Sequence, residues 1–266
     1  MTRETIFLKL GGSLITDKDK PYTPRLDKLK DLALEIKTVL DSRPELILIL
    51  GHGSGSFGHT AAKKYGTRNG VETSEQWHGF AEVRFQAAEL TRYVMQTLLE
   101  AGVPAIPFSP SASMVSNLRK VTSHNILAIR KALEAHLLPV IHGDVAFDET
   151  LGGTILSTED VFAFLAEHLP PTRILLAGIE AGVWADFPAR TRLVKQIQMS
   201  DYEKMKAGIG GSASTDVTGG MKAKVEEMFG LIQKNKGLTV QIFSAEEGGL
   251  LTRALQGENV GTLLSE

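Results

Sequence analysis

The sequence predicts an α/β protein in which a central, open and mostly parallel sheet lies between two layers of helices, a three-layer αβα sandwich. Two observations carry this prediction. Continuous apolar runs such as residues 46–50 have the length and composition of strands that are buried on both faces of a sheet. They alternate with longer segments, such as residues 26–40, in which apolar residues recur at helical spacing. This alternation is typical of parallel strands connected by helices that pack on both faces.

The individual elements follow from the same two patterns. Strands are expected at residues 6–10, 46–50, 103–108, 137–141, 173–177 and 239–243. Helices are expected at residues 26–40, 80–101, 124–135, 161–168 and 221–233. Ser157 or Thr158 suits the N-cap of the fourth helix, and residues 145–156 suit a hairpin.

The topology also predicts where a ligand would bind. Ligands of open α/β sheets lie beyond the carboxyl ends of the strands. We therefore expect a site in the loops that follow Leu10, Leu50, Ile141 and Ala177.

Size and composition narrow the possible functions. A chain of 266 residues can form one large α/β domain or two lobes that share a sheet. Its formal net charge of −2 gives no reason to expect nucleic-acid or anionic-membrane binding. The absence of cysteine excludes disulfides, thiolate metal sites and cysteine nucleophiles. No signal peptide and no stretch of about 20 apolar residues is visible, so we expect a cytoplasmic protein.

Three glycine-rich segments are candidates for phosphate binding. Gly11-Gly12-Ser13 follows the first strand, residues 52–59 (HGSGSFGH) follow the second, and residues 216–224 open a helix. Glycine lets the backbone approach a ligand and point several N–H groups at one anion, and a helix N-terminus adds a positive dipole end. Three such segments suggest a ligand with several phosphates, or two phosphorylated ligands.

Three lysines add positive charge near these segments: Lys9, Lys18 and Lys224. A single Gly-Gly turn is more often a plain turn, and a single lysine is more often a solvated side chain. Lys9 differs because it interrupts the apolar run 6–10, where a lysine needs an edge position or a partner.

The histidines allow two interpretations. His59 closes the second glycine-rich segment, and it either bonds to nearby backbone or donates to the phosphate of a bound substrate. His52 and His142 stand at strand ends and suit structural roles. No histidine pair with a nearby carboxylate indicates a zinc site.

The second segment also matches a different nucleotide motif. Residues 53–58 fit the dinucleotide pattern Gly-x-Gly-x-x-Gly, and Glu72 or Glu75 lies near the distance of a ribose-binding acid. A nicotinamide-dependent oxidoreductase is therefore an alternative, although it leaves Lys9 and His59 unexplained. The Walker phosphate loop and the serine-hydrolase elbow are both absent.

Taken in order, the segments resemble the amino acid kinase superfamily and, within it, the isopentenyl phosphate kinase family. The matching segments span most of the chain: residues 8–13, 15–18, 52–59, 142–145, 157–161, 182–184 and 216–224. The Ser-Phe-Gly-His ending at residues 56–59 is similar to that of isopentenyl phosphate kinases and of fosfomycin kinases, whose acceptors carry a phosphate or a phosphonate. The resemblance implies transfer of phosphate from ATP with Mg²⁺, isopentenyl phosphate as the acceptor, and a homodimer.

The resemblance also implies a role for each matching residue. The catalytic residues would be Lys9, Lys18, His59 and Asp160, and Asp160 would orient the two lysines. The acceptor phosphate would be held by Ser54, Gly55, His59 and Gly143. The isoprenoid tail would contact Phe80, Val83 and Val145, for which plain core packing is an equally good interpretation. ATP would contact Lys9, Gly11, Gly12, Ser13, Gly55, Gly178, Gly220 and Lys224, with Mg²⁺ carried largely by the phosphates.

By the same resemblance, the chain has two lobes on one continuous sheet. Residues 1–170 would bind the phosphate acceptor and residues 171–266 the nucleotide. Three places depart from the family pattern. Ser54 stands where glycine is usual, Glu159 where aspartate is frequent, and residues 176–183 differ from the segment that relatives carry near the nucleotide.

Two further alternatives stay open at this point. A fosfomycin kinase would need polar groups where Phe80 and Val83 are expected to form an apolar wall. A non-catalytic sensor of nucleotides would bind tightly without turnover. Fold analogy alone does not choose between them.

Overall fold

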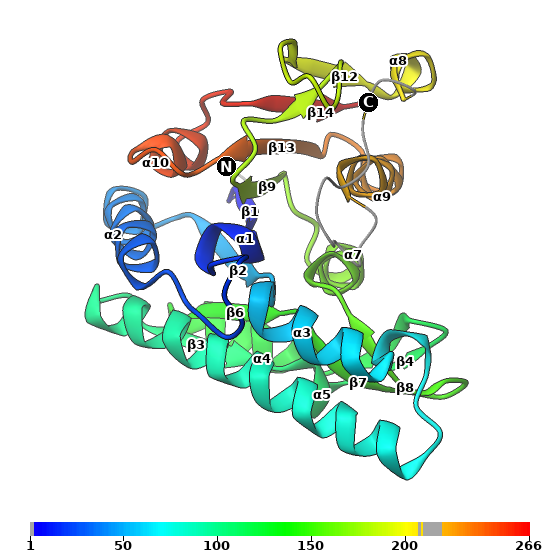
Figure 1. Cartoon of the computed structure of the whole chain (residues 1–266). Helices are drawn as coiled ribbons and strands as arrows, with labels where there is room; N and C mark the ends of the chain where they lie inside the picture. Colours follow the sequence, from blue (N-terminus) through cyan, green and yellow to red (C-terminus); the bar gives the residue numbers. More distant parts are fainter. Residues whose placement is uncertain (1–2, 207–208, 210–219) are drawn as a thin grey trace.

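The computed structural model describes residues 3–206, 209 and 220–266. Within these residues, eight strands form the central sheet in the order β12-β14-β13-β9-β1-β2-β6-β3 (Figure 1). Six neighbouring strands are parallel: β13 (Thr239–Ser244), β9 (Arg173–Gly178), β1 (Thr5–Leu10), β2 (Ile47–His52), β6 (Leu138–His142) and β3 (Ala105–Phe108). At one side, β14 (Thr262–Ser265) is antiparallel to β13, and β12 (Gln196–Gln198) is parallel to β14. The predicted mostly parallel open sheet is confirmed.

Helices cover both faces of this sheet, which confirms the three-layer sandwich. One face carries α2 (Leu26–Ser42), α4 (Ser74–Glu100) and α10 (Leu250–Leu255), and the other carries α6 (Ile126–Glu134), α7 (Thr158–His168) and α9 (Gly220–Lys234). Side chains of β1 alternate between the two cores, because successive residues of a strand point to opposite faces. Ile6 and Leu8 pack in the first core and Phe7 in the second.

Smaller elements complete the fold. A second sheet has the order β5-β4-β7-β8, with β4 (Met114–Asn117), β5 (Lys120–His124), β7 (Asp144–Asp148) and β8 (Gly152–Leu156). A short hairpin pairs β10 (Val183–Trp184) with β11 (Leu193–Val194). The short helices are α1 (Gly12–Ile15), α3 (Gly55–Tyr65), η1 (Thr67–Asn69), α5 (Pro110–Ser113) and α8 (Met199–Met205). No helix in the described part of the chain has the length and apolar character needed to cross a membrane.

The predicted elements differ from the observed ones mainly at their ends. Helix α4 begins at Ser74, well before residue 80, because Thr73 and Gln76 form a capping box. The backbone N–H of Thr73 donates to the Gln76 side chain at 3.0 Å. The predicted hairpin is β7–β8, and Ser157 is the N-cap of α7. Strands β4, β5, β10–β12 and β14 were not predicted, because each has at most five residues and lacks a clear apolar pattern.

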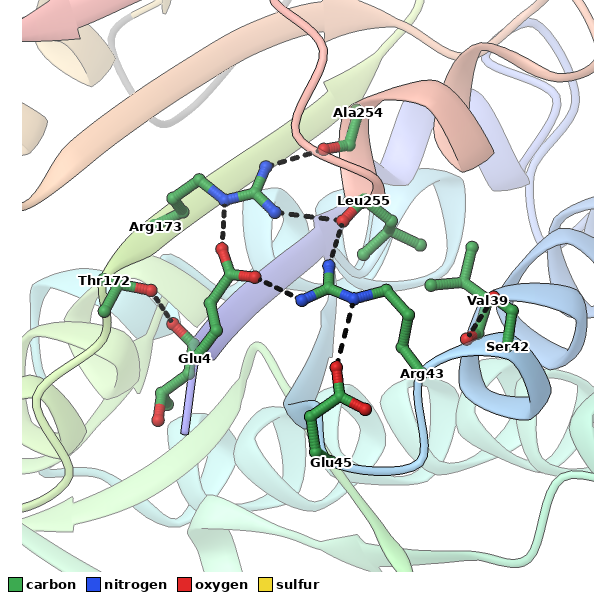
Figure 2. A network of polar contacts seen from close by, with 10 residues as sticks. Glu4, Val39, Ser42, Arg43, Glu45, Thr172, Arg173, Ala254 and Leu255 are labelled. Carbon is green, nitrogen blue, oxygen red and sulfur yellow. Dashed lines mark hydrogen bonds and ion pairs between the residues drawn. The ribbon is translucent and has the colours of Figure 1, made fainter. Parts of the chain in front are cut away.

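The amino ends of the central strands are closed by charged side chains (Figure 2). The Glu4 carboxylate accepts from Arg173 Nε at 2.6 Å and from Arg43 Nη2 at 2.7 Å. The two guanidinium groups also donate to the last carbonyls of α10, at Ala254 and Leu255, with distances of 2.7 to 3.0 Å. Because helix ends leave carbonyls without intrahelical partners, this network caps α10 and ties it to the sheet.

At the opposite edge, the carboxyl ends of the central strands lie at the same level. Leu10 pairs in register with His52 on one side and with Ala177 on the other, and His52 pairs with His142. The loops expected to form a site therefore come together as predicted.

Candidate active site

A cleft of about 1410 Å³ opens at the carboxyl edge of the sheet. It is lined by residues from the ends of β1, β2, β6 and β9 and from α3, α7 and α9. Most of the predicted site residues line it: Lys9, Gly11, Gly12, Ser13, Lys18, Ser54, Gly55, His59, Val83, Gly143, Gly178, Gly220 and Lys224. Residues far apart in the sequence therefore share one cavity, as the loop positions predicted.

The first two glycine-rich loops pack directly against each other. A side chain at Gly12 would collide with the backbone of Gly55, and Gly55 itself has a φ of +48°. Thr16 joins the two loops, since its Oγ1 accepts from Ser56 N at 3.0 Å and donates to Gly12 O at 2.7 Å. Part of the glycine content thus permits loop-to-loop contact, in addition to any approach to a ligand.

Lys9 does not stand at an edge. Its strand, β1, lies between β2 and β9, so the lysine needs a partner inside the protein. That partner is Glu159 on the first turn of α7, whose Oε2 forms a hydrogen-bonded ion pair with Lys9 Nζ. The two side chains are 14% and 7% exposed, so the pair is nearly buried at the base of the cleft.

The ionisation of Glu159 is set by the lysines around it. Burial alone would raise the pKa of this carboxyl, but the positive charges of Lys9 and Lys224 outweigh burial and hold the pKa below its usual value. Glu159 therefore carries a negative charge at neutral pH and can fix the position of the Lys9 ammonium group.

Asp160 is hydrogen-bonded at the start of α7, and its orientation of the two lysines stays a prediction. Its Oδ2 accepts from Ser157 N at 2.7 Å and from Ser157 Oγ at 2.8 Å, which makes it the acidic half of the α7 capping box. Glu159 pairs with Lys9. Successive helical residues point about 100° apart, so one faces the cleft while the other turns back to the helix start. Asp160 borders a small adjoining cavity of about 150 Å³.

The three histidines near the cleft differ in burial. His59, on α3, lines the cleft and is partly exposed. His52 and His142 are buried and stack on each other, with ring centroids 5.3 Å apart. Burial lowers the pKa of His52 to about 3 and that of His142 to about 4, so both rings are neutral at neutral pH. Their Nδ1 atoms lie 3.1 and 3.2 Å from the next carbonyl in the chain, which assigns them a structural role.

The predicted tail contacts are found together, but one of the three reaches the cleft. Val83 lines it, next to Ala62, Ala87 and Ile155. Phe80 and Val145 belong to the same apolar cluster but lie outside the cleft lining, so they support the wall from behind. Phe80 packs against Trp77 and Phe147, with ring centroids 5.2 and 5.3 Å away. For these two residues, core packing is the role that the structure supports.

Side chains within residues 180–190 that were not predicted as site residues also line the cleft. Glu180, Trp184, Phe187 and Arg190 all line the cavity. Glu180 Oε2 accepts from Trp184 Nε1 at 3.1 Å, and its Oε1 lies 3.3 Å from Arg190 Nη1. Glu180 belongs to the departing segment 176–183 and Trp184 to the matching segment 182–184, and neither pattern indicated that the Trp184 indole and the Arg190 guanidinium would share a cavity.

Of the third glycine-rich segment, residues 216–219 lie outside the described residues. Gly220 begins α9, and Lys224 lies one turn further along the same helix and lines the cleft. A helix start and a lysine therefore contribute to the cavity from the C-terminal part of the chain, as predicted.

A profile of the amino acid kinase family matches residues 4–244. Fold and site together define a member of the amino acid kinase family, and the chain belongs to it.

More similar relatives narrow the assignment. The chain is 35% identical to the isopentenyl phosphate kinase of Methanocaldococcus jannaschii and 34% identical to that of Methanothermobacter thermautotrophicus, with 96% of each chain covered in both cases. A solved structure of isopentenyl phosphate kinase has a TM-score of 0.82 at 29% identity, covering 98% of this chain and 100% of its own. Within the amino acid kinase family, the chain therefore groups with the isopentenyl phosphate kinases, which confirms the resemblance seen in the sequence.

Proposed function

We propose that the protein transfers the terminal phosphate of ATP to isopentenyl phosphate and releases ADP and isopentenyl diphosphate. A phosphate oxygen of the acceptor attacks the γ-phosphorus, and the bond from that phosphorus to the bridging oxygen of ADP breaks. The attacking oxygen is already anionic near neutral pH, so no general base is required. Catalysis then rests on positioning and on neutralising negative charge.

The observation that carries this proposal is the composition of the cleft. Lys9, with its ammonium group fixed by Glu159, faces the same cavity as His59 and as the apolar wall at Val83. A cation next to a phosphate-binding loop and an apolar wall suits an acceptor with an anionic head and a hydrocarbon tail. Similarity to isopentenyl phosphate kinases supports the same choice.

Each residue then has a part in the transfer. Lys9 and Lys18 neutralise charge on the transferring group, and Glu159 orients Lys9. The acceptor phosphate is held by His59 with Ser54, Gly55 and Gly143. The ATP phosphates are held by Gly220 and Lys224 with Gly11, Gly12, Ser13 and Gly178. Burying the tail against Val83 contributes about 0.8 kcal/mol per CH₂.

The two lobes divide the substrates between them. Residues 1–170 supply the acceptor side, and residues 171–266 supply the nucleotide side. We place the nucleoside of ATP near Trp184, because an indole face and the Arg190 guanidinium offer stacking and hydrogen-bonding surfaces at the rim of the cleft. The Glu180 carboxylate holds both side chains in place.

We expect Mg²⁺ to enter this cleft bound to the phosphates of ATP. Three of the described carboxylates that line it are engaged, Glu159 with Lys9, Asp144 with Ser111, and Glu180 with Trp184, and a fourth, Asp19, is exposed. Mg²⁺ keeps several waters and is commonly bound through substrate phosphates and few carboxylates. When bound, it would neutralise phosphate charge, and removing it with a chelator should abolish turnover.

The alternative acceptor is a phosphonate such as fosfomycin. The side chains beside Val83 in the cleft are Ala62, Ala87 and Ile155, and this apolar surface offers a small polar acceptor few partners. Family membership leaves the nicotinamide-dependent oxidoreductase without support. Turnover on any acceptor would exclude the non-catalytic nucleotide sensor. The homodimer and the cytoplasmic location stay predictions.

The deciding experiment is ADP release from Mg·ATP with isopentenyl phosphate as the acceptor. Dimethylallyl phosphate, fosfomycin, N-acetylglutamate and UMP serve as parallel acceptors. Saturable turnover on the isoprenoid phosphates, with little on the polar acceptors, is the expected result. Turnover on fosfomycin alone would indicate a phosphonate kinase of the same fold. Tight nucleotide binding without turnover on any acceptor would favour a sensor.

A further inference from the structure

Residues 17–24, which we call the Lys18 loop, connect α1 to α2 at the mouth of the cleft. Lys18 is exposed, and both Lys18 and Pro21 line the cavity. The base of the loop is closed by a hydrogen bond from Asp17 N to Thr23 O at 2.9 Å. The loop is thus a closed structure that carries an exposed cation, and its position depends on what it packs against.

The loop is fixed at two points, and both lie on consecutive residues of α3. Immediately before the loop, Thr16 Oγ1 accepts from Ser56 N at 3.0 Å. Near its end, the Tyr22 ring meets the Phe57 ring edge to face, with centroids 6.0 Å apart and an interplanar angle of 72°. Helix α3 also carries His59, so one helix contacts the Lys18 loop twice and presents the histidine to the cleft.

Tyr22 has a backbone conformation that is unfavourable for a residue with a bulky side chain. It has a φ of +53°, which is unusual for a bulky residue, and its side chain is 37% exposed. Strained backbone persists where the surroundings enforce it, and such residues gather at functional sites. The Tyr22 hydroxyl makes no hydrogen bond to any residue that the structure describes, and the aromatic contact of its ring is with Phe57. Phe57 itself is buried and held from its other side by Tyr93.

We propose that Tyr22 is a positioning residue for phosphoryl transfer. Its ring holds the Lys18 loop against α3, so that Lys18 and His59 approach the transferring phosphoryl group from one rigid unit. Tyr22 acts through Lys18 and touches neither substrate. This inference rests on the proposed kinase function.

The test compares two substitutions of Tyr22. Tyr22→Asn removes the ring but tolerates a positive φ, and Tyr22→Phe keeps the ring and removes the hydroxyl. We expect Tyr22→Asn to lower kcat at least tenfold while the KM for ATP stays within twofold, and we expect Tyr22→Phe to keep kcat within twofold. A Tyr22→Asn enzyme with normal kcat, or an equal loss in Tyr22→Phe, would overturn the proposal.

Two controls separate positioning from general loss of stability. Tyr93→Ala removes a ring contact to the same Phe57 side chain but leaves the Lys18 loop alone, and we expect its kcat to stay within about twofold. In a Lys18→Ala background, Tyr22→Asn should cause no further loss of kcat, because its effect passes through the lysine. A full additional tenfold loss in that background would contradict the proposed route.

A measurement without turnover keeps this inference separate from the proposed function. Hydrogen exchange at the Asp17 amide, which is bonded to Thr23 O, reports whether the loop is closed. We expect faster exchange in Tyr22→Asn and unchanged exchange in Tyr22→Phe. Equal exchange in all three proteins would overturn the role of Tyr22 even if the enzyme is an isopentenyl phosphate kinase. Faster exchange with no kinase activity on any acceptor would instead reject the proposed function.

Discussion

One charged cluster lies at the amino ends of the parallel strands, which we call the amino edge, and another lies at their carboxyl ends, the carboxyl edge. The two clusters are built differently. At the amino edge, Glu4 lies between Arg43 and Arg173, whose remaining donors reach the carbonyls that end α10. At the carboxyl edge, Lys9 has Glu159 as its protein partner within the described residues and faces a cleft of about 1410 Å³. The first cluster is closed by the protein itself, whereas the second leaves room for a ligand.

The chemistry of the cations explains this difference. A guanidinium offers five donors in a planar fork, which suits fixed contacts to a carboxylate and to carbonyls at once. An ammonium group is a compact charge with three rotatable donors, so Lys9 can hold Glu159 and still donate to a phosphate. We therefore expect substitutions at the carboxyl edge to change activity and substitutions at the amino edge to change stability.

Lys9→Ala should cause the largest loss of activity. Removing a preorganised positive charge from a site of phosphoryl transfer lowers kcat by about 10² to 10³-fold. It also removes the ion-pair partner of the buried Glu159 and leaves Lys224 as the nearby cation, so the melting temperature should fall. The double variant Lys9→Ala/Glu159→Gln should recover much of the melting temperature and none of the activity. A Lys9→Ala enzyme with kcat within tenfold of the parent would contradict the expectation that substitutions at the carboxyl edge change activity.

His59→Ala should have the next largest effect, confined to the acceptor. Loss of a donor to the acceptor phosphate should lower kcat/KM for isopentenyl phosphate by about 10²-fold, while the KM for ATP stays within about twofold. The matched control is His136→Asn, an exposed histidine in a left-handed conformation, which asparagine tolerates. Normal kcat/KM for every acceptor that the parent uses would contradict the role of His59.

At the amino edge, Arg173→Ala should lower stability and leave kcat unchanged. The substitution removes one charged contact to Glu4 and two donors to the end of α10, and we expect a loss of about 2 to 3 kcal/mol in the free energy of unfolding. Chemical denaturation measures this quantity. Arg253→Ala breaks an exposed pair with Glu258 and should cost about 1 kcal/mol or less. A large fall in the kcat of Arg173→Ala, at a temperature where the variant is folded, would contradict the expectation that amino-edge substitutions affect stability alone.

The sequence predicted most of what depends on local pattern. The strand and helix order, the meeting of four loops and the need of Lys9 for a partner all follow from spacing and polarity. The identity of that partner does not, because Glu159 and Asp160 are adjacent acids and the choice depends on the helical start set by Ser157. The contact of Gly12 with Gly55 joins two separate loops and leaves no local signal.

The apolar wall shows the same limit. Phe80, Val83 and Val145 form one cluster, as a resemblance could suggest, but which of them faces the cleft depends on how α4 packs on β7 and β8. Periodicity says that a helix face is buried and does not say whether it meets a core or a cavity.

The smallest expected effects are on the pH dependence of the unfolding free energy. Glu4 at the amino edge and Asp144 in the cleft should contribute to it with opposite signs. At the amino edge, burial opposes ionisation of Glu4, but Arg173 and Arg43 outweigh it and hold the pKa below the usual 4.5. Glu4 therefore stabilises the fold above pH 4.5, and this stabilisation is lost as pH falls through the lowered pKa. Glu4→Gln should flatten the decline in unfolding free energy on the acid side of pH 4.5.

In the cleft, Asp144 behaves in the reverse way. Burial raises its pKa from 3.8 to about 6, and it exceeds the opposing effects of the Ser111 hydrogen bonds and of Arg84. Between these two values the folded protein holds a proton that the unfolded chain has released, so this contribution to stability is present below pH 3.8 and is lost as pH rises through about 6.

Asp144→Asn should therefore flatten the pH dependence of unfolding free energy between pH 3.8 and about 6 while leaving the acid limb assigned to Glu4 intact. Urea denaturation of the parent, Glu4→Gln and Asp144→Asn at half-unit steps of pH measures both slopes. Equal slopes in parent and Asp144→Asn across that window would mean that Asp144 is ionised throughout and that Arg84, 3.5 Å from its Oδ2, outweighs burial. The cleft carboxyl would then resemble Glu4, and the contrast between the two edges would rest on Lys9 and His59 alone.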